Sequence, residues 1–167
     1  MFIVKRPLSA LLQECHYFEP PHQVKSHVTS ELQIIPNIGI GPLRFGMRPD
    51  EVRRRFPEEE TYEEWMGGNL NDSLLYRGLI LGFDAHDTHG PLADSHFNEV
   101  RLNRREDARL WGRGLFAWTK ASIRDHLENN SIAYESYENG DISVASLSVA
   151  MSFDEAELLV DIEMWSS

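Results

Sequence analysis

Gly39 to Phe56 of this chain reads GIGPLRFGMRPDEVRRRF, and we expect the rest of the chain to be organised around this stretch. Its glycines bracket a short apolar segment, which a helix then follows. Pro49 suits the first turn of a helix, and Asp50 with Glu51 favours the positive N-terminal end. We therefore predict a short extended segment that leads into a helix, with three apolar side chains on the segment: Leu43, Phe45 and Met47.

A second stretch repeats this pattern about 71 residues later. It begins at Gly114 with the sequence GLFAWTKASIRDHL. Such an internal match predicts a supersecondary unit that occurs twice. The corresponding positions are Phe45, Met47, Val52, Arg53 and Phe56 in the first copy and Phe116, Trp118, Ile123, Arg124 and Leu127 in the second.

The match continues downstream of both helices. Three further pairs of segments correspond: 62–68 with 134–140, 79–84 with 149–154, and 100–102 with 158–164. Each of these segments has the alternation or the aromatic content that is typical of strands. We predict a helix followed by about three strands in each half. The alternative is two unrelated segments that share only an amphipathic α+β pattern.

Length and composition indicate one compact domain of the α+β class. A chain of 167 residues with ordinary apolar content can bury a core of its own. We predict tandem repeats of a helix and antiparallel strands, with the helices packed on one face of the sheet. The expected divisions are an N-terminal segment at 1–33, a first repeat at 34–103 and a second repeat at 104–167.

The chain is strongly acidic, with 27 Asp and Glu against 16 Lys and Arg and a formal charge of −11. Ten of the acids lie in 114–167, where Lys120 and Arg124 are the only lysine and arginine. This field repels nucleic acid phosphates, so we expect no nucleic acid partner. It favours a basic protein partner, or else serves only to keep the chain in solution.

The sequence predicts no membrane span, no export signal and no disulfide. No apolar run is long enough to cross a bilayer. Met1 to Cys15 superficially resembles a lipoprotein signal, but Glu14 stands where processing needs a small residue. Cys15 is the one cysteine, so an internal disulfide cannot form. We expect a cytoplasmic protein that has no membrane partner.

Alternation near the C-terminus predicts two strands with one face on the core. In 142–153 the inward side chains are expected to be Ala145, Leu147, Val149, Met151 and Phe153, with small residues between them. In 158–165 the expected inward side chains are Leu158, Val160, Ile162 and Met164, and the expected outward ones are Leu159, Asp161, Glu163 and Trp165.

Acids and aromatic rings are expected to share the outer face of the sheet. Rings supply most of the energy at protein interfaces, and fixed carboxylates steer a cationic partner. In the alternative interpretation, the rings cover helices and the acids are ordinary solvated positions. We predict a partner-binding face made of Glu63, Trp65, Tyr76, Glu135, Tyr137, Asp161, Glu163 and Trp165.

The segment 84–96 has the highest density of histidine and aspartate in the chain. His86, His89 and His96 lie among carboxylates at spacings that could ligate zinc or another first-row metal. A long polar hairpin between two strands is the more common explanation of such a segment. No catalytic motif stands out elsewhere, so we expect no cofactor.

The opening stretch resembles a family. Its pattern of Gly-Ile-Gly-Pro, apolar residues, Gly-Met, a polar residue, an acid and Glu-Val spans Gly39 to Val52. This pattern is similar to one in small bacterial proteins, several of which are immunity proteins of polymorphic toxin systems. The duplicated unit of a helix and strands is similar to that of beta-lactamase-inhibitor-protein-like folds.

The resemblance implies a cytoplasmic protein that binds and blocks a toxin made beside it. The acidic balance fits, because many toxin domains are basic nucleases. Our leading hypothesis is a non-catalytic immunity or inhibitor protein that occludes the active site of a cognate toxin. Two alternatives stay open, namely a metal-dependent enzyme that uses the histidines of 84–96 and a general protein-binding adaptor.

Overall fold

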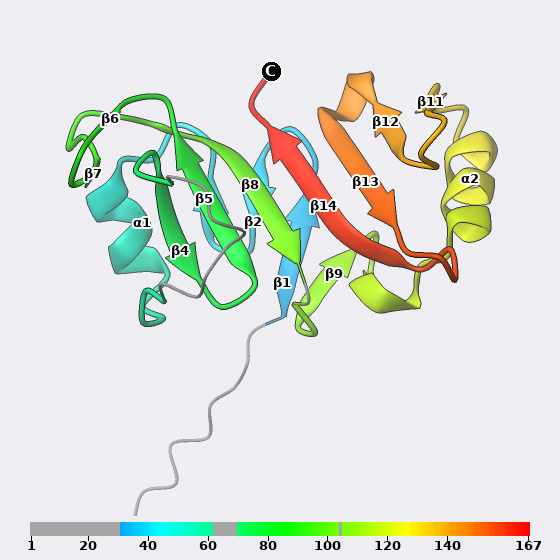
Figure 1. Cartoon of the computed structure of the whole chain (residues 1–167), viewed down its shortest axis with the longest axis horizontal. Coiled ribbons are helices and arrows are strands. Elements are labelled where there is room, and N and C mark those ends of the chain that lie inside the picture. The colour runs from blue at the N-terminus through cyan, green and yellow to red at the C-terminus, as the bar shows by residue number, and fades with distance from the viewer. Residues whose placement is uncertain (1–30, 62–69, 104) are drawn as a thin grey trace, which may run out of the picture.

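The structure, a computed structural model, describes residues 31–61, 70–103 and 105–167. Its fold is α+β, as the sequence predicts, with two main sheets around one core (Figure 1). The first half contains β1 (Leu32–Ile35), β2 (Gly39–Ile40), β3 (Leu43–Arg44), α1 (Pro49–Arg55), β4 (Ser73–Tyr76), β5 (Leu79–Phe83), β6 (His86–Asp87), β7 (Gly90–Pro91) and β8 (Phe97–Asn103). The second half contains β9 (Ala108–Leu110), β10 (Arg113–Gly114), η1 (Leu115–Ala117), α2 (Lys120–Asn129), β11 (Glu135–Ser136), β12 (Ile142–Val144), η2 (Ala145–Leu147), β13 (Val149–Phe153) and β14 (Leu159–Trp165).

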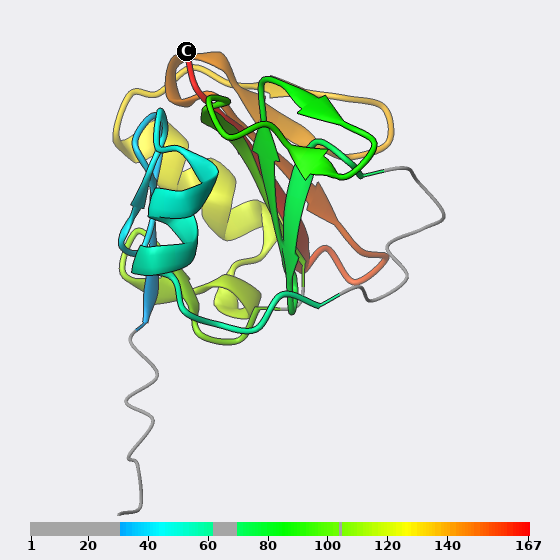
Figure 2. The same ribbon diagram turned by 90° about the vertical axis from the view of Figure 1, so that its left-hand side faces the viewer.

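The larger sheet has seven strands in the order β11-β12-β13-β14-β8-β5-β4. Helices α1 and α2 and the smaller sheet lie on the same side of it (Figure 2). The opposite side, which we call the outer face, is turned toward the viewer in Figure 1. Among the described residues no helix covers the outer face. None of the described helices is long and apolar enough to span a membrane.

Two strands on each side of the central antiparallel pair, β8 and β14, correspond in order, and β11 at one edge has no counterpart among the described strands. The strands β5 and β13 flank this pair and cover all but the last residue of the aligned segments 79–84 and 149–154. The strands β4 and β12 come next on either side. Corresponding side chains of the two helical segments are buried: Val52 of α1 and Phe56 directly after it, and Ile123 and Leu127 of α2.

The smaller sheet also joins the two halves, in the order β10-β9-β1-β2-β3. Its central strands β1 and β9 run parallel, with Leu32 opposite Ala108 and Ile34 opposite Leu110. All four side chains are buried in the core. The two halves of the chain therefore meet through a parallel strand pair in the smaller sheet and through an antiparallel pair in the larger sheet.

The opening stretch forms the elements that its sequence predicts, namely β2, β3 and a helix that begins at Pro49. The helix has no Ser or Thr cap. Instead, the backbone N–H of Arg48 donates to Oε2 of Glu51 at 3.0 Å, which closes the first turn. Gly39 has a φ of +145°, and a Cβ there would overlap the carbonyl oxygen of Leu43. Only glycine fits this position.

Tyr76 does not lie on the outer face, so that prediction is wrong. The two-residue turn at Arg77 and Gly78 places Tyr76 directly opposite Leu79, and both side chains therefore face the core. The Tyr76 side chain is 1% exposed. Its ring meets the Phe56 ring edge-on, with centroids 5.0 Å apart. Burial, aided by the nearby acid Glu60, raises the pKa of Tyr76 to about 12.

The segment 142–153 is two strands and not one, which also corrects the prediction. Strand β12 ends at Val144, and the chain returns through η2 to β13. Ser148 makes this reversal with a left-handed conformation at φ 50°. As a result Ala145 is exposed, whereas Val149 and Met151 are buried as expected.

The inward and outward sides of β14 follow the prediction only in its second part. Ile162 and Met164 face the core, as expected. Before them the pairing with β13 shifts register, so Leu159 is buried and Leu158 is exposed, the reverse of the prediction. A β-bulge of this kind shifts the alternation by one residue.

The predicted strand at 62–68, with Glu63 and Trp65, and the segment 1–30 lie outside the described residues.

Arg105 ties three connections of the fold together. Its buried guanidinium makes four hydrogen bonds of 2.9 Å to the carboxylates of Glu58 and Asp107. It also donates to the carbonyl oxygen of Arg77 at 2.8 Å. Glu58 follows α1, Arg77 lies in the β4–β5 turn and Asp107 precedes β9. The ion cluster therefore fixes both sheets relative to α1.

We predict that Arg105→Ala lowers the free energy of unfolding by about 2–4 kcal/mol, because it leaves two neighbouring carboxylates without their cation. Arg101→Ala is the matched control. Arg101 also contacts two carboxylates, Glu99 and Glu163, but its side chain is 50% exposed, so its loss should cost less than about 1 kcal/mol. Urea denaturation followed by circular dichroism measures both. Equal losses would contradict this role of Arg105.

Candidate functional site

Acids and rings gather on the outer face of the larger sheet, on the side of β11, β12 and β14. Strand register places Asp161 opposite Ser152 and Glu163 opposite Ala150, so both acids point outward with small neighbours. Glu135 of β11 lies opposite Ser143 of β12 in the same way. We call this region the acidic face and define it by the side chains of Glu135, Tyr137, Asp141, Asp161, Glu163 and Trp165.

The structure brings together five of the eight residues that the sequence assigns to a partner-binding face: Glu135, Tyr137, Asp161, Glu163 and Trp165. Tyr76 lies in the core, and the other two are outside the described residues. Tyr137 is 53% exposed, and its hydroxyl donates to Oε2 of Glu135 at 3.2 Å. Trp165 is half-buried at the end of β14.

Sequence reasoning missed Asp141 of the acidic face, and it missed Arg101 of β8, which borders this face. Arg101 lies opposite Glu163 across the central pair, and its Nη2 donates to Glu163 at 3.2 Å. Its Nε donates to Glu99 at 2.8 Å. Arg101 and Glu163 are 62 positions apart in the sequence, so no local pattern predicts their contact. One cation thus partly balances two carboxylates of the outer face.

Asp161 is held in an environment that disfavours its charge. Burial, together with the neighbouring charges of Glu163 and Asp141, raises the pKa of Asp161 to about 6, although Arg101 acts in the opposite direction. Its direct neighbour on β8 is Asn103, which brings no charge. Near neutral pH a cation that approached Asp161 would relieve this unfavourable ionisation.

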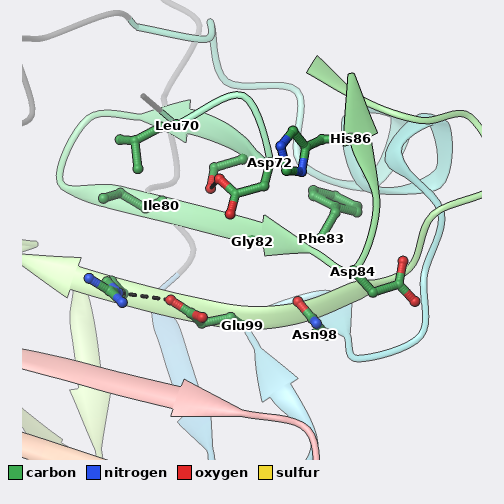
Figure 3. Close-up of a pocket in the computed structure, with 11 residues that line it drawn as sticks. Leu70, Asp72, Ile80, Gly82, Phe83, Asp84, His86, Asn98 and Glu99 are labelled. Atoms are coloured by element: carbon green, nitrogen blue, oxygen red, sulfur yellow. Dashed lines mark hydrogen bonds and ion pairs between the residues drawn. The ribbon is translucent and has the colours of Figure 1, made fainter. Parts of the chain in front are cut away.

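A pocket of about 370 Å³ opens on the outer face where β4, β5 and β8 run side by side (Figure 3). We call it the β5 pocket. Its floor contains a row of directly opposed residues, Ser73, Gly82 and Glu99. A Cβ on Gly82 would lie only 3.0 Å from the Cβ of Glu99, so a side chain here would both occupy the floor and crowd Glu99.

Apolar and acidic side chains share the walls of the β5 pocket. Leu70 and Ile80 lie at one end in Figure 3, and Asp72 and Glu99 lie on either side of β5. Asp84 lies at the opposite end from Leu70. Hydrogen bonds, first of all the one from the His96 backbone N–H at 2.8 Å, keep the pKa of Asp84 below its usual range.

The histidines of 84–96 do not converge on one point. His86 and His89 are exposed on the β6–β7 hairpin, in which Oδ1 of Asp87 accepts from the His89 N–H at 2.7 Å. His96 instead pairs with Asp84, at 3.3 Å between Nδ1 and Oδ2. Throughout 31–61, 70–103 and 105–167, no group of three or more His, Cys, Asp or Glu could hold a metal ion. The segment contains the polar hairpin that the sequence analysis favoured.

Comparison with protein-family models, curated proteins and solved structures gave no match to this chain.

We predict that Asp161→Asn raises the free energy of unfolding at pH 7.5 by roughly 1–2 kcal/mol, after allowance for solvent screening at this partly exposed position. Because the folded state raises the pKa of Asp161 from 3.8 to about 6, the native protein binds this proton more tightly than the unfolded chain does. The wild type therefore gains stability as the pH falls from above 6 toward 3.8, and the advantage of the variant should disappear below about 4.

Denaturant titrations at several pH values between 4 and 8 measure this difference. Asp125→Asn, which removes an exposed acid on α2, is the control and should change stability by less than about 0.5 kcal/mol throughout. A variant at position 161 that is less stable than the wild type at pH 7.5 would show that the Asp161 charge is compensated in the fold.

Proposed function

We propose that this chain is a non-catalytic immunity or inhibitor protein, which binds a basic toxin through the acidic face and covers the active site of that toxin. The observation that carries the proposal is the position of Asp161. Its place on β14 sets this carboxylate two residues from Glu163, on a sheet face that has no helix cover among the described residues. Burial and the charges of Glu163 and Asp141 raise its pKa there. Carboxyl groups with a perturbed pKa are common at functional sites.

The acidic face has the composition that recognition of a basic protein requires. Tyr137 and Trp165 offer rings that can be desolvated as anchors. Glu135, Asp161 and Glu163 offer carboxylates at fixed positions on strands, so that little side-chain ordering is needed on binding. Opposite charge would also speed the encounter with a cationic surface.

The sheet offers a rigid surface on which a partner could dock. The core behind the acidic face is a continuous cluster of buried apolar side chains from both halves. In the described parts of the chain, the histidines of 84–96 are dispersed and do not form a metal site. A rigid sheet with an exposed polar side gives a pre-organised docking surface, in which the backbone moves little between the free and the bound state.

Co-expression tests the biological role. We expect the product of the adjoining open reading frame to kill cells when it is expressed alone, and to be tolerated when this chain is expressed with it. The two purified proteins should form a stable complex. Survival of cells that express the neighbouring gene alone would contradict an immunity role and favour a general adaptor.

Substitutions on the acidic face test the binding surface. Asp161→Lys and Trp165→Ala should each weaken the complex by at least about tenfold, because the first opposes a basic partner and the second removes an anchor. Association should also slow as salt rises. Surface plasmon resonance measures both rate constants.

Two substitutions away from the acidic face serve as controls. Asp125→Lys makes the same charge change on α2, and Phe116→Ala removes a ring that is 38% exposed on η1. Both should bind within about twofold of the wild type. Circular dichroism must show that all four variants are folded. If folded Asp161→Lys and Trp165→Ala bind as the wild type does, the acidic face is not the interface.

A further inference from the structure

The β5 pocket is a concave site lined by both apolar side chains and carboxylates. We infer that it receives the side chain of one arginine from the protein partner. The inference rests on the proposed function, because it assigns a specific contact to the same partner. The volume of about 370 Å³ is at the small end of the range for ligand pockets, roughly 300–1,000 Å³, so it suits a single side chain.

The charge of the pocket selects a cation. Its lining contains the carboxylates of Asp72, Asp84 and Glu99 and the guanidinium of Arg101, which leaves a formal charge of −2 with His86 neutral. Anionic ligands such as phosphates would meet this field unfavourably. A guanidinium or ammonium group would be attracted to it.

The shape of the pocket favours arginine over lysine. Leu70 and Ile80 supply an apolar end, against which the methylene groups of a long side chain can pack. Asp72 and Glu99 lie on the two sides of Gly82, where the floor has no side chain (Figure 3). A planar guanidinium can donate to two carboxylates at once, whereas an ammonium group is a compact, strongly hydrated point charge.

The acids of the pocket are held in place before any ligand arrives. The Nε of Arg101 fixes Oε1 of Glu99 at 2.8 Å, and the hydroxyl of Ser73 donates to Oδ1 of Asp72 at 3.0 Å. In each carboxylate the other oxygen has no hydrogen bond among the described residues. Arg101 also reaches Glu163, so the pocket is continuous with the acidic face. A protein that covered the acidic face would extend over the pocket.

The first test uses a minimal probe, N-acetyl-arginine amide, titrated into the ¹⁵N-labelled full chain. Saturable shift changes are expected at the backbone amides of Gly82, Asp84, Asn98 and Glu99. The citrulline derivative has nearly the same shape without the charge and should give no saturable change, and the lysine derivative should bind more weakly. Equal responses to arginine and citrulline, or shifts spread over all surface acids, would overturn the inference.

Two variants remove different features of the pocket. Glu99→Gln removes one charge at constant shape, and Gly82→Ala fills the floor with a methyl group. Each should weaken binding of the arginine derivative by at least about tenfold. Asp125→Asn, on α2, should bind within about twofold of the wild type. Wild-type affinity in both folded pocket variants would overturn the assignment of the site.

Binding of the cognate toxin separates this inference from the proposed function. If Gly82→Ala and Glu99→Gln weaken the toxin complex as Trp165→Ala does, the pocket holds an arginine of that toxin. If only Trp165→Ala weakens the complex, the proposed function stands and the pocket assignment fails. If the arginine derivative binds but no toxin does, the pocket recognises a free guanidinium ligand, and the partner named here is wrong.

Discussion

The pairing of β8 with β14 sets which side chains of the two central strands enter the core and which face outward. These two strands come from different halves of the chain and lie at the centre of the larger sheet. Their register sends Val100, Leu102, Ile162 and Met164 into the core, with no more than traces of exposed surface. Because side chains alternate along a strand, the same register sends Arg101, Asp161 and Glu163 outward. A slip of one residue would bury the charges and expose the core.

This one register also explains why the acidic face and the β5 pocket are neighbours. The outward residues of β14 contribute Asp161, Glu163 and Trp165 to the acidic face, and the outward residues of β8 contribute Glu99 and Arg101 to the pocket. Arg101 bridges the two through Glu99 and Glu163. Stability is supplied elsewhere, by the apolar core and by the buried Arg105 cluster. The outer face is therefore free to hold groups such as Asp161 that do not stabilise the fold.

The sequence predicted what depends on local chemistry. Pro49 and the acids after it marked the start of α1, and alternation identified the inward side chains of β13 and the second part of β14. Two errors came from loop geometry. The length of the turn before Leu79 decides that Tyr76 faces inward, and a left-handed residue at Ser148 divides a run that alternates without interruption. Neither is visible in the hydrophobic pattern.

The candidate site was predictable only in part, for the same reason. Glu135, Tyr137, Asp161, Glu163 and Trp165 could be grouped because period two places them on one face. The contact of Arg101 with Glu163 and the row that makes the floor of the β5 pocket join segments far apart in the chain. They follow from strand order, which alternation does not specify. Gly82 in particular gave no sign in the sequence that its missing side chain opens a pocket.

The most direct test of the central claim is carboxyl footprinting of the chain alone and in complex with the cognate toxin. Carbodiimide labelling with mass spectrometry reports the reactivity of each acid. We expect Glu135, Asp161 and Glu163 to lose most of their reactivity in the complex, while Asp50 and Asp125, on the helices, keep theirs. Unchanged labelling of the acidic face, with protection of the helix acids instead, would contradict it.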